Sequence, residues 1–286
     1  MNRATSPLLP PESLRVRDNR IDGGKVISTV VLIAFGFIFV APMLWLILSS
    51  VDASATWQTK LPVLTLNNFS TAMSPDNAKA FANSLILSGI ATVVSTVCAV
   101  LAAYSFSRHH IPWKGPILLF LLFLSGVPVT ILIVPVYRMF LYMDWLSLIP
   151  TSILIAVTSL PFQIYMLKNS IDALPIDIEE AAQIERAKTH QILLRVVLPL
   201  IMPGVASAAI FGFVNAWGSF LLPIILIDDS GSQPAPTAIY SFISSVNPDY
   251  GALAAFSLIY SLPVVLLYVC LSRQFKAGFV LGGAVK

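Results

Sequence analysis

The chain has 286 residues, of which 57% are hydrophobic and only 11% are charged. Soluble domains average about 25% charged residues, so a surface that faces water on all sides cannot be built from this composition. The net charge of +3 is too small for a typical nucleic-acid binder. The two cysteines, Cys98 and Cys270, both lie inside long apolar runs, which argues against a disulfide scaffold. Most of the surface is therefore expected to meet lipid.

Six apolar stretches are long enough to cross a bilayer, since about 20 helical residues span a hydrocarbon core of about 30 Å. They cover residues 26–48, 82–105, 117–139, 148–167, 199–227 and 253–271. Period-2 alternation is absent, so we predict an all-α membrane protein with six transmembrane helices. The predicted domains are an N-terminal tail at 1–25, a transmembrane domain at 26–272 and a C-terminal tail at 273–286.

The placement of lysine and arginine predicts the orientation. Most of these residues lie in the two tails and in the connections after the second and fourth spans. Positive charge is concentrated on the cytoplasmic side of membrane proteins. We therefore expect a multi-pass protein of the plasma membrane with both termini in the cytoplasm.

Several chemical classes lack support in the sequence. None of the fourteen acidic residues falls inside a predicted span, although ion-coupled carriers often place an ionisable residue there. The one Gly-Lys pair, Gly24-Lys25, is followed by Val26, so the chain has no phosphate-binding loop of the G-x-x-x-x-G-K-[ST] type. We predict no catalytic residue, no metal and no cofactor in this chain. An ion-coupled secondary carrier or channel is the alternative to a transporter whose motor lies in another subunit.

The connection at 168–198 is the longest on the expected cytoplasmic side. Pro175 is suited to a helix start, and the acids Asp177, Glu179 and Glu180 complement the helix dipole there. A narrow apolar stripe follows, made of Ile178, Ala181, Ala182, Ile184 and Ala187. Small side chains allow a second protein to approach closely. Periodicity alone leaves open whether this helix docks a partner or lies on the lipid headgroups.

The literal sequence of this connection is more specific. Glu180-Ala181-Ala182, followed by Leu198-Pro199, resembles the EAA loop of the membrane subunits of ATP-binding cassette (ABC) importers. Further landmarks of that family resemble Asn67-Asn68-Phe69, Asn83-Ser84, Ala102-Ala103-Tyr104-Ser105-Phe106-Ser107-Arg108, Leu160-Pro161-Phe162, Ala216-Trp217 and Gly282-Gly283-Ala284-Val285-Lys286. Together they cover roughly residues 28–286 and resemble the MalG-like permease subunits of binding-protein-dependent carbohydrate importers.

This resemblance implies a type I ABC importer permease fold in the bacterial inner membrane. The 175–190 loop would form a coupling helix seated in a separate ATPase, which binds the ATP and Mg²⁺. The implied ATPase contacts are Glu180, Ala181, Ala182, Arg186 and Ala187, and the implied ATPase-interface tail is Gly282, Gly283, Ala284 and Val285. The implied partners are a second homologous permease chain, an ATPase dimer and an extracytoplasmic sugar-binding protein. No nucleic acid is expected.

Two positions depart from the family pattern. Arg186 stands where relatives usually have glycine, and arginine does not reach positive φ at little cost. We therefore expect either a right-handed bend or a straighter loop at Arg186. Gly218 and Ser219 follow Trp217, where relatives continue with Asn and an acid. This difference argues against transferring a substrate contact from the relatives to these positions.

The sequence says less about the extracytoplasmic connections and about the residues that line a substrate pathway. The stretches 51–80 and 228–250 are irregular connections that, by resemblance, would receive the binding protein. Aromatic rings stack on sugars, so Tyr137, Phe162, Tyr165 and Trp217 are candidate substrate-pathway residues, although each also suits a membrane interface or lipid-facing position. The stretch Ser125-Gly126-Val127-Pro128 is the expected place for a gating bend.

Overall fold

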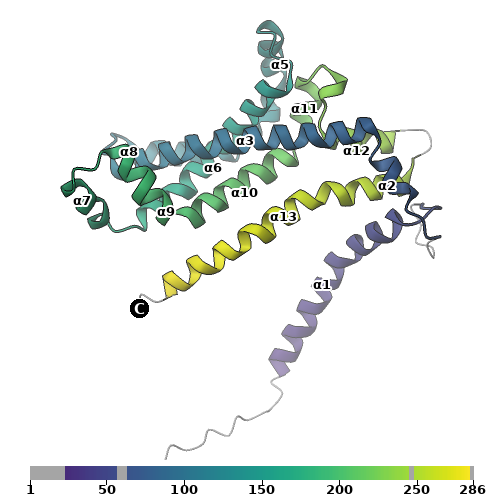
Figure 1. Ribbon diagram of the computed structural model, residues 1–286, viewed down its shortest axis with the longest axis horizontal. Helices are drawn as coiled ribbons and strands as arrows, with labels where there is room; N and C mark the ends of the chain where they lie inside the picture. The colour runs from purple at the N-terminus through teal and green to yellow at the C-terminus, as the bar shows by residue number, and fades with distance from the viewer. Residues whose placement is uncertain (1–22, 57–62, 245–247, 284–286) are drawn as a thin grey trace, which may run out of the picture. The chain divides into compact units, whose positions relative to one another are not determined.

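The structure is a computed structural model that describes residues 23–56, 63–244 and 248–283 (Figure 1). Residues 1–45 and 46–286 form two separate units. The first described helix, α1 (Gly23–Ser50), is strongly apolar and contains Pro42. Most of the predicted N-terminal tail lies outside the described residues.

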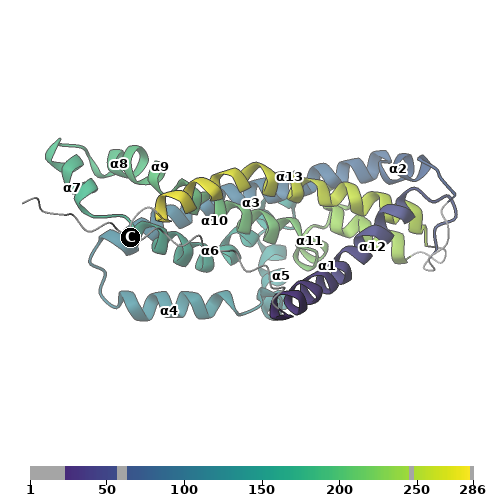
Figure 2. The ribbon, with the colours of Figure 1, turned by 90° about the horizontal axis from the view of Figure 1, so that it is seen from below.

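The second unit is built around three long helices that pack lengthwise: α3 (Pro75–Arg108), α6 (Leu148–Asp172) and α10 (Met202–Trp217). Figures 1 and 2 show them running side by side. Their buried faces are rich in small residues, which allow helix backbones to approach closely in membranes. These residues include Ser88, Ala91, Ser95, Ala99, Ala103, Ser152, Ala156, Ala208 and Gly212.

The third predicted span is not one continuous helix. It consists of α4 (Lys114–Ser125), the 3-10 turn η1 (Val129–Leu132) and α5 (Ile133–Tyr142), with a bend of 80° between the two halves. The break falls at Gly126–Pro128. The ring of Pro128 would clash with the carbonyl four residues earlier, and proline has no backbone N–H to donate, so α4 cannot continue through this residue. The position of the predicted bend is confirmed.

The expectation of a single span at 199–227 is wrong. The helical segment begins earlier, with α8 (Thr189–Ile192), the π-helical turn η2 (Leu193–Val197) and α9 (Leu198–Leu200). It then turns by 83° into α10, which ends at Trp217, and α11 (Leu221–Leu226) follows. Pro203 at the start of α10 cannot continue a helix from the preceding turn, and apolar composition alone does not reveal such a corner.

The remaining helices of the second unit are α2 (Asn67–Ala72), α7 (Asp177–Ile184), α12 (Ala235–Ser244) and α13 (Tyr250–Gly283), with a 3-10 turn η3 (Ser230–Ser232). α7 and α12 lie near opposite ends of α3 (Figure 1). Among the described residues the only strand-like pairing is an isolated bridge between Asp52 and Leu64.

The helical fold class is confirmed. Four described helices are long and apolar enough to span a membrane, and the number rises to six if each bent pair counts as one span. Large apolar side chains are exposed along the outer faces, for example Val93 and Val97 on α3 and Phe120 and Phe123 on α4. Such faces are expected where helices meet lipid or another membrane subunit.

Candidate coupling site and transport pathway

The candidate coupling helix α7 lies at one end of the α3–α6–α10 bundle (Figure 1). It begins at Asp177, two residues after Pro175, and the carbonyl of Ile176 accepts hydrogen bonds from the amides of Glu179 and Glu180. The acids of the first turn therefore stand where the unpaired amides and the positive end of the helix dipole favour them.

The end of α7 is closed by a left-handed residue, which corrects both expectations for Arg186. Its φ of 62° lies in the region that glycine adopts easily. The Arg186 amide donates to the carbonyl of Gln183 at 2.8 Å, and the Ala187 amide donates to that of Ala182 at 3.0 Å. This pair of bonds is the Schellman motif. The loop thus keeps the sharp turn of a glycine-terminated helix with arginine in that place.

The five predicted ATPase-contact residues do not share one environment. Glu180, Ala181 and Arg186 are exposed. Ala182 and Ala187 are half-buried and pack against the hydrophobic cluster of this chain's own α3, α6 and η2. The predicted apolar stripe is therefore divided, since Ile184 at its other edge is 84% exposed.

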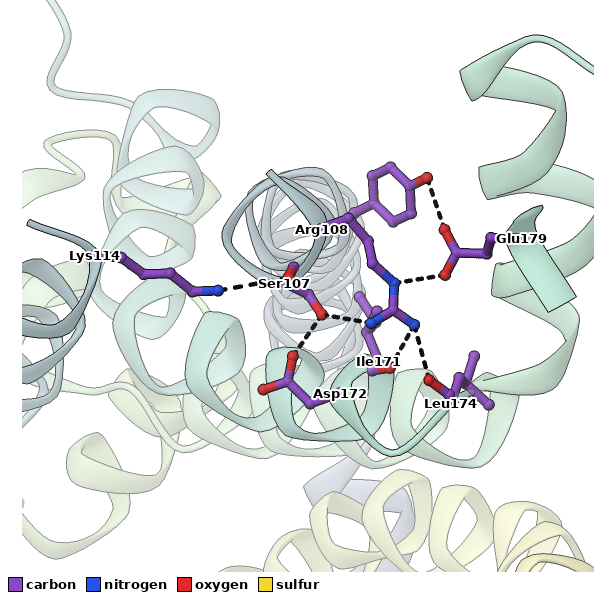
Figure 3. Close-up of polar contacts among 8 residues, drawn as sticks. Ser107, Arg108, Lys114, Ile171, Asp172, Leu174 and Glu179 are labelled. Carbon is purple, nitrogen blue, oxygen red and sulfur yellow. Dashed lines mark hydrogen bonds and ion pairs between the residues drawn. The ribbon is translucent and has the colours of Figure 1, made fainter. Parts of the chain in front are cut away.

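Glu179 is a functional candidate that the sequence analysis did not select. Its side chain is buried, and its two carboxylate oxygens face α3 (Figure 3). The Arg108 guanidinium donates through Nε at 2.6 Å, and the Tyr104 hydroxyl donates at 3.0 Å. Tyr104 and Arg108 belong to the family landmark at 102–108. That landmark was the only sequence signal that could have pointed to a partner for Glu179.

Arg108 also binds the end of α6. Its Nη2 donates to the carbonyls of Ile171 at 3.0 Å and Leu174 at 3.1 Å (Figure 3). Beside it, the Ser107 hydroxyl donates to Asp172, which also pairs with Lys168. A cavity of about 250 Å³ opens at this end of the molecule, between Arg108, His109, Glu180 and Thr189.

The predicted tail residues are only partly described. α13 continues through Gly282 and Gly283, so the backbone stays helical beyond the predicted boundary at 272/273. Ala284 and Val285 lie outside the described residues. The role of this tail stays a prediction.

The four aromatic pathway candidates lie on three helices, with Phe162 and Tyr165 both on α6. Tyr137, on α5, lines a cavity of about 700 Å³ together with Asp76, Lys79 and Asp228. Phe162 packs on Phe211 with ring centroids 4.5 Å apart. Their role as substrate contacts stays a prediction.

The other two candidates differ sharply in exposure. Tyr165 is 39% exposed on α6, whereas Trp217 is 3% exposed. Trp217 stacks on Tyr260, and its Nε1 donates to the Tyr260 carbonyl at 3.1 Å. In this conformation Trp217 joins α10 to α13 and is shielded from the surface.

The η1 break and the interruption between α10 and α11 meet at a third cavity. Pro128 and Thr130 from the η1 break, Thr158 from α6, and Asn215 and Ser219 from the end of α10 line about 230 Å³. The Asn215 amide donates to the Ser159 hydroxyl at 2.9 Å. Irregular backbone at membrane depth is tolerated where it is buried in protein or lines a water-filled cavity, and both interruptions border this cavity.

At the α12 end, the 228–250 stretch is tied to the bundle by side-chain hydrogen bonds. Asn83, on α3, donates to the carbonyls of Gly231 and Gln233, each at 3.1 Å. Hydrogen bonds from the Ser232 hydroxyl and the Gly231 amide lower the pKa of the Asp229 carboxyl. This turn is therefore stabilised by ionised Asp229, and that stabilisation is lost as the pH falls through its lowered pKa.

Comparison with known proteins identifies the class. The family described as "Binding-protein-dependent transport system inner membrane component" matches residues 95–277, which include α6, α7 and α10. The chain belongs to this family of membrane transport subunits.

Its relatives include permeases of carbohydrate uptake systems. The diacetylchitobiose uptake system permease protein NgcG of Streptomyces coelicolor is 32% identical over 91% of this chain and 88% of its own length. A second such permease of that organism, DasC, is 28% identical over 90% and 95%. The trehalose transport system permease protein SugB of Mycobacterium tuberculosis is 29% identical over 86% and 92%.

The fold has counterparts among solved structures. A chain of a bacterial ABC transporter involved in the import of the acidic polysaccharide alginate superposes with a TM-score of 0.75 over 94% of this chain and 100% of that one, at 19% identity. A chain of an alginate transporter in complex with its pentasaccharide-bound periplasmic protein gives a TM-score of 0.66 over 88% and 93%, at 14% identity. The importer permease fold is thereby confirmed.

Proposed function

We propose that this chain conducts a carbohydrate through the inner membrane as one of two homologous permease subunits, driven by a separate dimeric ATPase. The family match, the importer permease fold and the names of the relatives support an importer permease for carbohydrates. They favour it over the ion-coupled carrier that composition left open. The observation that carries the ATPase coupling is α7, a short acidic helix that exposes Glu180 and Ala181 at one end of the bundle.

In this account the ATPase binds ATP and Mg²⁺ and grips α7, while this chain performs no hydrolysis. Closure of the ATPase dimer moves α7, and the helix bundle switches its access from one membrane face to the other. The α7 end then faces the cytoplasm, in agreement with the positive charge of its connections.

The substrate is proposed to be a sugar or sugar oligomer. The hydroxyl and amide groups of Thr130, Thr158, Asn215 and Ser219 around the cavity at the helix breaks offer hydrogen bonds without net charge. Such groups suit a neutral, hydroxyl-rich solute. At the other end, the stretches 51–80 and 228–250 are proposed to receive a sugar-loaded binding protein. The solved complex of an alginate ABC transporter with a pentasaccharide-bound periplasmic protein supports a partner of this kind.

A charge reversal tests the ATPase assignment. Glu180→Lys places a cation at the exposed face of α7, and we expect the ATPase to be lost from the purified membrane complex. Asp228→Lys makes the same charge change at an exposed residue in the 228–250 stretch and should retain the ATPase. Retention of the ATPase and full transport by Glu180→Lys would contradict the proposal.

A further inference from the structure

One ion pair connects the coupling helix to the long helix α3. The Arg108 Nε to Glu179 Oε1 distance is 2.6 Å, and the two side chains are only 12% and 6% exposed. A charge pair withdrawn from water is screened weakly by solvent and salt. Removing one member of a buried pair also leaves an uncompensated charge, so such a pair separates with difficulty.

Both carboxylate oxygens of Glu179 accept hydrogen bonds from side chains of α3. One oxygen accepts from Arg108 and the other accepts from the Tyr104 hydroxyl, one helical turn earlier on α3. Two attachment points a turn apart fix the direction of the side chain as well as its position.

The same guanidinium holds the end of α6. Its Nη2 donates to the carbonyls of Ile171 and Leu174, so Arg108 joins α3, the end of α6 and α7 (Figure 3). A planar fork of five donors can serve these acceptors simultaneously, whereas the single ammonium of lysine cannot reproduce that geometry.

We propose that Arg108 and Glu179 form a latch that makes α7 and α3 move as one body during transport. The proposal rests on the function proposed above, because it concerns how ATPase motion enters this chain. Without the latch, α7 would be held to the bundle by the short segment 173–176 and by the packing of Ala182 and Ala187 against the hydrophobic cluster. With it, movement of α7 is delivered directly to α3 and to its extensive packing with α6. Arg108 and Glu179 are positioning residues in this account, while Glu180 faces the ATPase.

Spin labels can test whether the latch stays closed. Leu101 on α3 and Asp177 on α7 are exposed, and cysteines there can be labelled after Cys98→Ser and Cys270→Ser replacement. The distance between the labels is measured by pulsed electron resonance in the assembled importer, first without nucleotide and then trapped with ATP and vanadate. We expect the same distance in both states.

Two variants separate the latch from ordinary structural support. In Glu179→Ala the label distance should broaden or shift on trapping, and transport should fall at least ten-fold while the ATPase still co-purifies. Glu185→Ala removes an exposed acid just after the same helix and should leave distance and transport unchanged. Arg108→Lys should restore part of the transport lost in Arg108→Ala.

The outcomes separate the latch from the function on which it rests. A change of about one helical turn, ~5 Å, between the two states of the otherwise wild-type chain would overturn the latch alone. Unchanged transport in Glu179→Ala, or loss of the ATPase from that variant, would also overturn it. Failure of the ATPase to co-purify with the wild-type chain would overturn the proposed function as well.

Discussion

Arg186 shows how one residue can hold an unfavourable backbone conformation because its surroundings require it. The two hydrogen bonds of the Schellman motif fix a φ of 62° at this position. A left-handed conformation costs an L-residue with a side chain roughly 1–2 kcal/mol. Glycine would adopt it without that cost, so the loop keeps a strained turn between α7 and α8.

Replacement of this arginine therefore has a predictable sign. Arg186→Gly should stabilise the closed loop by about 1 kcal/mol, which corresponds to roughly five-fold slower exchange of the Ala187 amide hydrogen. Arg186→Ala is the matched control, because it removes the guanidinium and keeps the strain. Hydrogen exchange followed by mass spectrometry measures both. Equal exchange in the glycine and alanine variants would show that the backbone is unstrained.

Glu179 marks the limit of sequence reasoning about single residues. Three acids occupy the first turns of α7, and their pattern predicts a helix start without distinguishing the inward-facing one. The distinction depends on Arg108, which lies 71 residues away in the sequence. Exposure of Glu180 and Ala181 agrees with a docking role, and that role itself stays a prediction.

At the level of helices, prolines account for breaks that hydropathy does not show. Apolar composition predicted approximately where the candidate membrane helices lie, because the hydropathy of a segment is summed over a window. The bend at Pro128 was predicted from its ring chemistry. The corner at Ile201 was missed, since two segments of similar hydropathy meet there at 83°.

The contact between α6 and α10 supplies a second prediction. A Cβ at Gly212 would lie 2.4 Å from Nε2 of Gln163, a fully buried side chain that donates to the Ala208 carbonyl at 3.0 Å. Gly212→Ala should therefore displace this amide and lower the stability of the folded chain by about 1–3 kcal/mol.

The chain offers a matched control on a neighbouring helix. A Cβ at Gly89, on α3, would meet nothing within 4 Å. Gly89→Ala should leave stability unchanged or raise it by up to about 1 kcal/mol, because alanine favours helix more than glycine does. Thermal unfolding of the two variants in detergent makes the comparison. An equal or higher midpoint for Gly212→Ala than for Gly89→Ala would refute the close contact.

In the second unit, the two candidate sites lie at different places along the long helices. The α7 end gathers charged residues and the exposed helix that is proposed to dock the ATPase, whereas the helix breaks place uncharged polar groups beside a separate cavity. α3 and α6 join the two regions through closely packed small residues. Such a frame can transmit displacement over its length, because well-packed helices shift as units.

The membrane class and the importer family could be predicted from the sequence because both depend on local features. The scarcity of charged residues, the length of the apolar spans and the Glu-Ala-Ala loop can each be recognised in a short stretch of sequence. The cavity beside Asn215 and Ser219 could not be predicted, since it forms where three separate segments meet. Ser219, which stands where relatives have an acid, lines this cavity.

The most direct test of the account is to ask what touches α7 in the membrane. A photo-reactive phenylalanine analogue at Ile184, whose side chain is 84% exposed, would be activated in cells that assemble the importer. Mass spectrometry of the products should identify the ATPase as the cross-linked partner, and the same probe at Phe120 on α4 should not yield it. Cross-links from Ile184 to lipid alone would contradict the claim that an external motor drives this chain.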